Sequence, residues 1–475
     1  MKTIKPIYLL ILAATLIAAT HMRFGFGILI FLETIPILFY LDRTSGWRSK
    51  ALLFGFLVLG WSLATLKIVT SPLPWFIAIG YGLPLATVKF GSYLAFVSFP
   101  QSKKTQWVFP TLMVMGEWLQ SSFTPFGSWG SAANTQINNI IWLQILSIGG
   151  LWILSFVIYF ISYQIYEGVR DGFLKARLVK IAIPILVLSM FGTLRLTRAD
   201  NTEYESLQVA TVGTNSSIGG PELPSSDVRS KNRAKIFDRM RKASDAGAKL
   251  VVWVEGATGL LPDEEADFQS EISQLTDSLN ITAVVSYVIL LSTEPFFYEN
   301  KYIILDAAGS IQSTYLKHEP VPGEPCTKGT EPHALYNMDG VDLGGAICYD
   351  FDFPVLGREI SKLGADLVAV PSSDWRGIDP IHTQMAAMRA IEGGFSLIRS
   401  TRWGLSATVD PYGRVIGQLS DFNSDEKILI SSVPKNGKRT IYSLLGDWVV
   451  ILGLCLLAYE FRKTRILPGN PVGGF

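Results

Sequence analysis

The stretch Gly344-Gly-Ala-Ile-Cys-Tyr-Asp350 decides the fold of one half of this chain, because a short apolar run ends there on a reactive thiol. Residues 343–347 predict a buried strand, and Phe353-Pro354 opens a helix with its apolar residues on one face. A second buried strand is predicted at 366–370. A strand, a helix and a strand in this order indicate an α/β layered domain.

The same alternation runs outward from this stretch. Further strands are predicted at 207–212, 250–254, 282–290, 302–306, 309–316 and 395–400. Helices are predicted at 227–246 and 383–392, and a hairpin at 406–415 around Asp410-Pro-Tyr-Gly413. We therefore expect one layered block near residues 198–440.

Apolar runs long enough to approach a membrane span surround this block, since a spanning helix needs about 20 such residues. We predict eight, at 7–19, 24–41, 51–69, 75–97, 107–119, 141–166, 178–194 and 443–461. The first resembles a cleaved signal peptide, but another apolar run follows almost at once, so we expect a retained anchor.

Positive residues gather in the loops on one side of these runs. They are Lys2, Lys5, Arg43, Arg48, Lys50, Lys103, Lys104, Arg170, Lys175, Arg177, Lys180, Arg462, Lys463 and Arg465. The positive-inside rule then places both termini in the cytoplasm and residues 198–440 outside it. The predicted parts are a seven-helix transmembrane domain (1–197), an extracytoplasmic catalytic domain (198–440), and an eighth helix with a cytoplasmic tail (441–475).

Composition excludes several classes. The chain of 475 residues is 49% apolar, 17% charged and carries a net charge of +1, so no nucleic-acid partner is indicated. Three cysteines without a C-x-x-C spacing argue against a disulfide framework and against a metal site. Only four histidines are present, so a Ser-His-Asp hydrolase is poorly supported, although His382 stays open as a candidate.

Three side chains at the ends of apolar runs supply the parts of thiol-based acyl chemistry: Glu255, Lys317 and Cys348. We expect Cys348, between a strand and a helix, to have thiolate character as a nucleophile. Glu255 is the candidate general base and Lys317 the candidate donor to an oxyanion. Each alone fits an inert thiol, a solvated carboxylate or a surface amine, and only their combination favours a catalytic site.

The segments around these residues resemble the three catalytic segments of the nitrilase (carbon-nitrogen hydrolase) superfamily. They are Trp253-Val-Glu255, Tyr315-Leu-Lys317-His318 with Val321-Pro-Gly-Glu324, and Cys348-Tyr-Asp350 with Phe353-Pro-x-x-Gly-Arg-Glu359. With eight membrane helices around them, the chain is similar to the bacterial apolipoprotein N-acyltransferase family. The resemblance implies a multi-pass α-helical membrane domain plus a nitrilase-like αββα sandwich.

It also implies an activity. Cys348 would take an acyl chain from a phospholipid as a thioester, and the N-terminal amine of a diacylglyceryl-cysteine lipoprotein would then receive it. Glu324, Trp253, Tyr349 and Asp350 would support the site or bind substrate. The resemblance further implies no cofactor, and a place in the bacterial inner membrane with the catalytic domain on the periplasmic side; a monomer is the default. An amidase or thiol acyltransferase acting on another amine, and an impaired scaffold, remain alternatives.

Two loops and one further thiol carry their own expectations. Residues 121–130 line a lipid entrance or form a plain interfacial turn, and residues 256–262 form a mobile lid with Leu260 and Leu261 on lipid or a simple surface loop. Cys326 is expected to be a free bystander, because a disulfide to Cys348 would consume the nucleophile. The family pattern changes at Asp350, at 373–376 and at Thr401-Arg-Trp-Gly404, which puts the acceptor in doubt more than the reaction.

Overall fold

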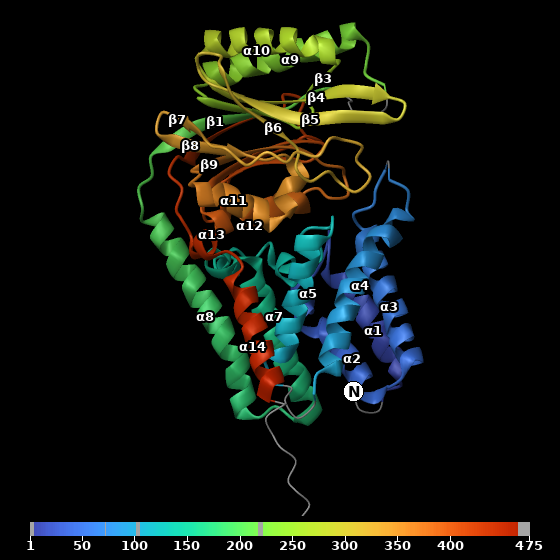
Figure 1. The fold of residues 1–475 in the computed structure, drawn as a ribbon. Helices are drawn as coiled ribbons and strands as arrows, with labels where there is room; N and C mark the ends of the chain where they lie inside the picture. Colours follow the sequence, from blue (N-terminus) through green and yellow to red (C-terminus); the bar gives the residue numbers. More distant parts are fainter. Residues whose placement is uncertain (1–3, 72, 101–104, 217–221, 464–475) are drawn as a thin grey trace, which may run out of the picture.

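The chain folds into a bundle of apolar helices with a layered α/β domain on one end of it (Figure 1). This computed structural model describes residues 4–71, 73–100, 105–216 and 222–463. Lys2, Lys103, Lys104 and Arg465, which belong to the positive loops, lie outside the described residues, as does the tail beyond residue 463.

Each of the eight predicted apolar runs contains a helix. The bundle helices are α1 (Pro6–Thr20), α2 (Ile30–Arg43), α3 (Trp47–Leu66), α4 (Ile77–Ser98), α5 (Val108–Phe123), α6 (Ile140–Leu143), α7 (Leu146–Asp171), α8 (Lys175–Asp200), α13 (Ile441–Leu445) and α14 (Trp448–Lys463). The short 3₁₀ turns η1 (Gly27–Leu29) and η3 (Ala132–Gln136) lie in the connections.

Two of these runs are interrupted where the prediction was continuous. The run at 141–166 is divided between α6 and α7, and α7 itself kinks at Gly149 and Gly150. Gly150 has φ of +62°, and a Cβ there would stand 2.5 Å from the Tyr442 ring, so both backbone and space require glycine. The run at 443–461 breaks at Gly446, which also has a positive φ.

Three of the described helices are long and apolar enough to cross a membrane by length and composition, namely α3, α7 and α8; α1 is a shorter apolar helix. Helix α8 exposes large apolar side chains along its length, among them Leu186 and Met190. An apolar surface of this extent marks contact with lipid or another protein rather than with water. The number of spans stays a prediction.

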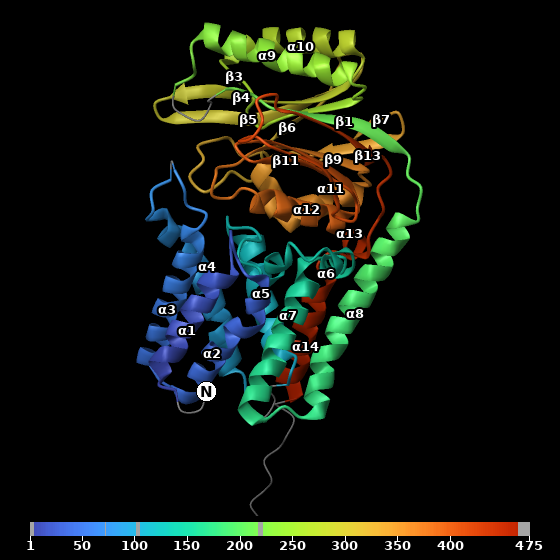
Figure 2. The same cartoon turned by 180° about the vertical axis from the view of Figure 1, so that it is seen from behind.

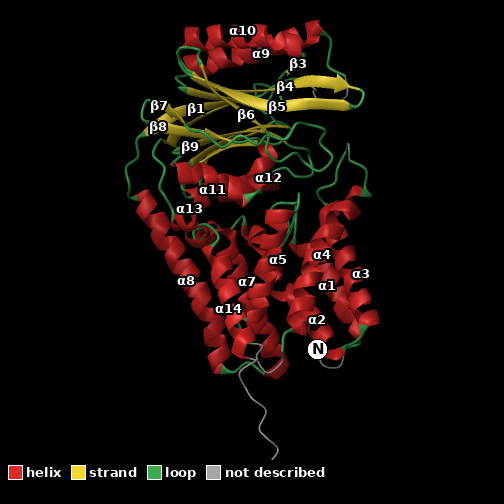
Figure 3. Ribbon diagram, viewed as in Figure 1, coloured by secondary structure: helices red, strands yellow, loops and turns green. Residues whose placement is uncertain are grey.

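Two sheets packed face to face form the layered domain (Figure 3). The first has the order β13-β1-β2-β4-β5-β6, with β3 paired to β4. Its strands are β1 (Ser206–Val212), β2 (Leu250–Trp253), β3 (Gly259–Leu260), β4 (Thr282–Thr293), β5 (Phe296–Leu305), β6 (Ile311–Leu316) and β13 (Ile428–Pro434). The second has the order β12-β11-β10-β9-β8-β7, made of β7 (Tyr336–Met338), β8 (Val341–Gly345), β9 (Leu367–Ser373), β10 (Ser396–Arg402), β11 (Leu405–Val409) and β12 (Val415–Ser420).

Helices cover the outer face of each sheet, which confirms the αββα sandwich (Figures 1 and 2). Helices α9 (Ser226–Asp245) and α10 (Glu265–Leu279) lie on the first sheet, with the 3₁₀ turn η4 (Pro262–Glu264) before α10. Helices α11 (Pro354–Leu363) and α12 (Ile381–Gly393) lie between the second sheet and the bundle. Strands β2 and β9 read as continuous apolar runs because both of their faces are buried.

The expectations for residues 256–262 are both wrong. Leu260 is fully buried, and β3 pairs in parallel with β4 through Gly259 and Leu260. Leu261, 39% exposed, and Pro262 reach the surface at the end of the segment. The segment is therefore part of the first sheet, neither a lid nor a surface loop.

Candidate active site

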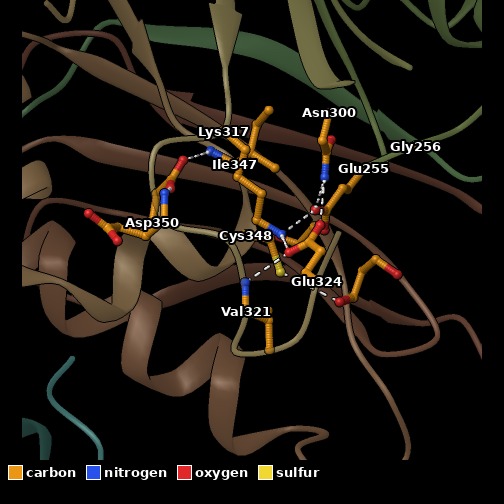
Figure 4. Close-up of polar contacts among 12 residues, drawn as sticks. Glu255, Gly256, Asn300, Lys317, Val321, Glu324, Ile347, Cys348 and Asp350 are labelled. Carbon is orange, nitrogen blue, oxygen red and sulfur yellow. Dashed lines mark hydrogen bonds and ion pairs between the residues drawn. The ribbon is translucent and has the colours of Figure 1, made fainter. Parts of the chain in front are cut away.

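Three strands of the sandwich end at one point and deliver the predicted side chains there (Figure 4). Glu255 follows β2, Lys317 follows β6, and Cys348 follows β8 after two residues. All three are buried, with exposed fractions of 5%, 2% and 3%. The Nζ of Lys317 lies 2.9 Å from Oε1 of Glu255. Residues separated by up to 93 positions thus meet because their strands belong to facing sheets.

A second carboxylate holds the other side of Lys317. Oε2 of Glu324 lies 2.7 Å from Nζ and also accepts the Val321 N–H at 2.9 Å. The Tyr298 hydroxyl donates to Oε1 of Glu324 at 2.9 Å, so this carboxylate is held from three directions. Asn300 was not expected from the sequence; its Nδ2 donates to Oε1 of Glu255 at 2.7 Å.

This arrangement fixes the charge on Lys317. Burial opposes its ammonium form, but Glu255 and Glu324 outweigh burial and hold the pKa of Lys317 well above its ordinary value. Burial likewise opposes the charge on Glu324, and Lys317 lowers the pKa of Glu324 below its ordinary value. The site thus contains an ammonium between two carboxylates, with the thiol beside them.

The expectation of a thiolate at rest on Cys348 is wrong. Burial, followed by the negative charge of Glu255, raises the pKa of Cys348 well above its ordinary value, and Lys317 offsets this only in part. The Sγ lies 3.5 Å from the carbonyl oxygen of Ser373. The group is therefore a thiol at neutral pH, and a nucleophilic role for it would need a base that removes its proton.

The backbone aims this thiol through a strained turn. Cys348 has φ of +47° and begins η5 (Cys348–Asp352). A non-glycine residue in the left-handed region costs free energy, and such strain persists only where neighbours enforce it. Asp350 is one of these neighbours, because its Oδ2 accepts the Ile347 N–H at 2.9 Å.

Asp350 also ties the turn at Cys348 to the loop after Lys317. Its Oδ1 accepts the N–H groups of His318 and Glu319 at 3.1 and 2.7 Å, directly after Lys317 in the chain. Burial raises the pKa of Asp350 to about 6, although the backbone N–H groups of Ile347 and Glu319 oppose the shift. Aspartate at this position is therefore a structural clamp between the turn at Cys348 and the loop after Lys317.

The remaining predicted residues lie around this centre. Trp253 is fully buried on β2, packed against Phe237 and Phe268 rather than in a cavity. Tyr349 donates its hydroxyl to the carbonyl of Pro125, in the loop between α5 and η3. Cys326 is a free thiol, as expected, and so is Cys348.

His382 belongs to a second buried cluster beside the thiol, which the sequence had left open. Its Nδ1 lies 2.7 Å from Oδ1 of Asp374 and its Nε2 3.1 Å from Oδ1 of Asp352. Burial opposes the charged ring, but the two carboxylates raise the pKa of His382 to about 9. Arg399 lies 2.8 Å from the same Asp374 oxygen.

Cys348, Asp374 and His382 offer possible metal-ligand atoms within 4.8 Å of one another. A bound cation there would displace the ring protons of His382 and face the guanidinium of Arg399. The charges at this point therefore disfavour a metal ion.

The loop at 121–130 reaches this cluster from the bundle. The indole N–H of Trp129 donates to Oδ2 of Asp352 at 2.8 Å, and the Ser128 N–H donates to the carbonyl of Asp352 at 2.8 Å. The loop is thus a docking element under the turn at Cys348, and Phe126 and Trp129 also line a cavity that reaches Cys348.

Cys348 stands where two cavities meet. A narrow one of about 40 Å³ is lined mainly by apolar groups of the bundle and of the sandwich. Its residues include Ile68, Tyr81, Leu85, Phe126 and Ile378. A wider one of about 410 Å³ is lined by Glu255, Lys317, Glu324, Tyr298, Arg402 and Trp403, among others. Both cavities include Val321, Cys348, Ser373 and Trp375.

Known proteins match both parts of the chain. Residues 208–440 match the family described as Carbon-nitrogen hydrolase, and this gives the class of the sandwich with its buried thiol. Residues 13–163 match the Apolipoprotein N-acyltransferase N-terminal domain. The two matches together take in most of the chain, which belongs to the apolipoprotein N-acyltransferase family.

Individual relatives extend over both parts. An apolipoprotein N-acyltransferase of Borreliella burgdorferi is 25% identical over 511 residues, which cover 93% of this chain and 92% of its own. One of Bradyrhizobium diazoefficiens is 27% identical over 399 residues, which cover 76% of this chain and 73% of its own. Among solved structures, an amidase from Nesterenkonia sp. covers 50% of this chain and 93% of its own, with 21% identity and a TM-score of 0.41.

Proposed function

We propose that this protein transfers an acyl chain from a membrane phospholipid, through a thioester on Cys348, to the N-terminal amine of a diacylglyceryl-cysteine lipoprotein. The observation that carries this proposal is the position of the buried thiol. Cys348 lines the same cavity as Glu255 and Lys317 and stands at the junction of an apolar cavity facing the bundle and this wider polar one. A lipid chain and a reacting polar group thus have separate places on either side of one sulfur.

In the first half of the reaction, the sulfur of Cys348 attacks the ester carbonyl of the donor while Glu255 accepts the thiol proton. Negative charge develops on the carbonyl oxygen, and Lys317 donates a hydrogen bond to it. The C–O bond then breaks, and the proton passes from Glu255 to the leaving alkoxide. The products are a lysophospholipid and the Cys348 thioester.

In the second half, the amine of the acceptor attacks the thioester carbonyl. Glu255 accepts a proton from the amine and returns it to the sulfur as the C–S bond breaks, which restores the thiol and leaves an amide. An ester and an amine are thereby exchanged for an alcohol and an amide. The donor ester supplies the driving force, so the chemistry needs no cofactor.

The arrangement of the chain supports a membrane enzyme with its catalytic domain outside the cytoplasm. The described positive residues Lys5, Arg43, Arg48, Arg170 and Lys175 lie at helix ends far from the sandwich, where the N-terminus also lies (Figure 1). By the positive-inside rule this end is cytoplasmic. We therefore keep the division into 1–197, 198–440 and 441–475 as part of the proposal.

A membrane position also suits both substrates. Exposing acyl chains to water costs about 0.8 kcal/mol per CH₂. An active site that opens beside the bundle avoids most of this cost.

Intact-mass measurement of the purified protein tests this function. After incubation with phospholipid vesicles, we expect a mass increase of one acyl chain, which a diacylglyceryl-cysteine peptide then removes by becoming acylated. Cys348→Ser should show no stable thioester adduct, whereas the matched control Cys326→Ser should behave as wild type. Acylation without Cys348, or an adduct confined to Cys326, would refute the proposal.

The same experiment separates the alternative. An adduct that forms normally but is discharged by simple amines or ammonia, and not by the diacylglyceryl peptide, would assign the chain to the amidases or to another thiol acyltransferase.

A further inference from the structure

Arg402 presents a buried cationic group to the wider cavity. It is the last residue of β10, and its backbone pairs with Ser373, the residue whose carbonyl lies beside the Cys348 sulfur. Only 7% of Arg402 is exposed. It lines the same cavity as Glu255, Lys317 and Cys348.

The guanidinium of Arg402 is fixed in direction without being neutralised. Its Nε donates to the Ser373 hydroxyl at 3.1 Å, and its plane lies over the Trp403 ring with the central carbon 4.5 Å from the ring centroid. One terminal nitrogen lies 3.9 Å from the point where a Cβ on Gly256 would stand. The other terminal nitrogen is buried and has no hydrogen-bond partner among the described residues.

The buried positive charge of Arg402 therefore has no carboxylate close to it in the described part of the chain. Burial lowers the pKa of Arg402, and the more distant charge of Glu255 offsets this in part. No described carboxylate lies within 4.0 Å of its guanidinium, although many other buried cations of the sandwich have one. Lys317, the other cation lining this cavity, is held by two carboxylates. A buried, oriented and unpaired guanidinium is costly unless a ligand completes it.

We propose that Arg402 binds the phosphodiester of the acyl donor in the wider cavity. This inference rests on the proposed function and names the part of the donor that the cavity recognises. Arginine suits this role because its planar fork binds phosphate oxygens through two parallel hydrogen bonds. The glycerol links the phosphate to the reacting ester within one small molecule, so Arg402 and Cys348 in one cavity can engage both groups at once. The chain on the ester then extends toward the narrow apolar cavity.

This assignment has a consequence for the two half-reactions. Arg402 contributes to formation of the thioester, because the donor carries the phosphate. It contributes little to discharge of the thioester, because the diacylglyceryl-cysteine acceptor carries none. Departure of the lysophospholipid leaves the guanidinium free again before the next donor binds.

The test compares two donors with identical acyl chains, phosphatidylglycerol and diacylglycerol, in mixed micelles with the full-length protein. The readout is the rate of thioester formation on Cys348 for each donor. Wild type should prefer the phosphate-bearing donor. In Arg402→Gln the ratio of the two rates should fall by roughly tenfold or more, as expected for loss of charged hydrogen bonds. Arg402→Lys keeps the charge but loses the planar guanidinium. Its ratio of the two rates should lie between those of wild type and Arg402→Gln.

Arg376→Gln is the matched control. Arg376 lies on the segment after β9, is exposed, and stacks over Phe422 outside this cavity. Its variant should keep the wild-type ratio, which excludes general attraction of the anionic lipid. A further arm adds inorganic phosphate to the diacylglycerol reaction.

Several results would overturn the assignment. If wild type formed the thioester at equal rates with both donors, the assignment would be wrong, and this result does not depend on whether Arg402→Gln folds. Equal loss with both donors would make Arg402 a part of the chemistry or of the scaffold. If inorganic phosphate raised the rate of thioester formation with diacylglycerol to the rate with phosphatidylglycerol, the cavity would be a site for a free anion and not for the phosphodiester of the donor. Failure of wild type to form a thioester with either donor would instead count against the proposed function itself.

Discussion

Replacing Lys317 by methionine tests the central charge arrangement most directly. The variant keeps an unbranched side chain one atom shorter, and leaves Glu255 and Glu324 facing each other without the ammonium that lies 2.9 and 2.7 Å from them. Removing one partner from a buried ionic group costs roughly 3–5 kcal/mol. For a domain of this size that corresponds to an apparent Tm lower by roughly 6–20 °C. Loss of the oxyanion donor should also slow thioester formation by about 10²–10³-fold.

The two effects can be separated with a second substitution. Adding Glu324→Gln to Lys317→Met removes one of the unpaired carboxylates, so part of the lost Tm should return while thioester formation stays slow. Tryptophan fluorescence on heating reports the Tm, and intact mass over time reports the rate. A Lys317→Met protein with wild-type Tm and wild-type rate would show that this ion group neither stabilises the site nor serves the reaction.

Two further outcomes follow from the cluster beside the thiol. The pKa of His382 is raised to about 9, since Asp352 and Asp374 outweigh burial, so its stabilising contribution is complete below about pH 6.5 and is lost as the pH rises through 9. The Tm advantage of wild type over His382→Gln should therefore shrink between pH 7 and pH 10, by an amount near 3 kcal/mol in stability; a constant difference would contradict this. Trp129→Phe removes the 2.8 Å bond to Asp352 and should lower the Tm by several degrees, since a buried carboxylate loses a partner worth about 1–3 kcal/mol. Trp47→Phe, at an exposed indole, is its control, and equal shifts in both variants would remove the docking role of Trp129.

The sequence was sufficient to predict the positions of the reactive residues. Glu255 and Cys348 follow the short runs of buried strands, whose two faces are covered. Lys317 follows β6, which is largely exposed. Helices α9, α11 and α12 were also predicted within a few residues. Helix α10 was missed although Phe268, Ile272 and Leu275 share its buried face, a signal that the acidic residues around them obscured.

The features that could not be predicted from the sequence depend on contacts between segments that lie far apart in the chain. The raised pKa of Cys348 results from burial and from Glu255, 93 positions away, whereas strand-end position alone indicated the opposite. Strand β13 was not predicted from the sequence. It is an edge strand, and its place in the sheet is set by its pairing with β1. Asn300 carried no local signal. His382 and the Thr401–Gly404 segment that contains Arg402 were noticed in the sequence, but their places beside Cys348 depend on the packing of the two sheets.

The pairing of β1 with β13 has a consequence for how the sandwich is attached to the bundle. Ser206, just after α8, lies opposite Pro434, just before α13, so the chain enters and leaves the sandwich at adjacent points (Figure 2). A domain whose ends lie side by side can be inserted into a host protein without distorting either partner. The sandwich is thus joined to the bundle at one place, through the short connections from α8 to β1 and from β13 to α13.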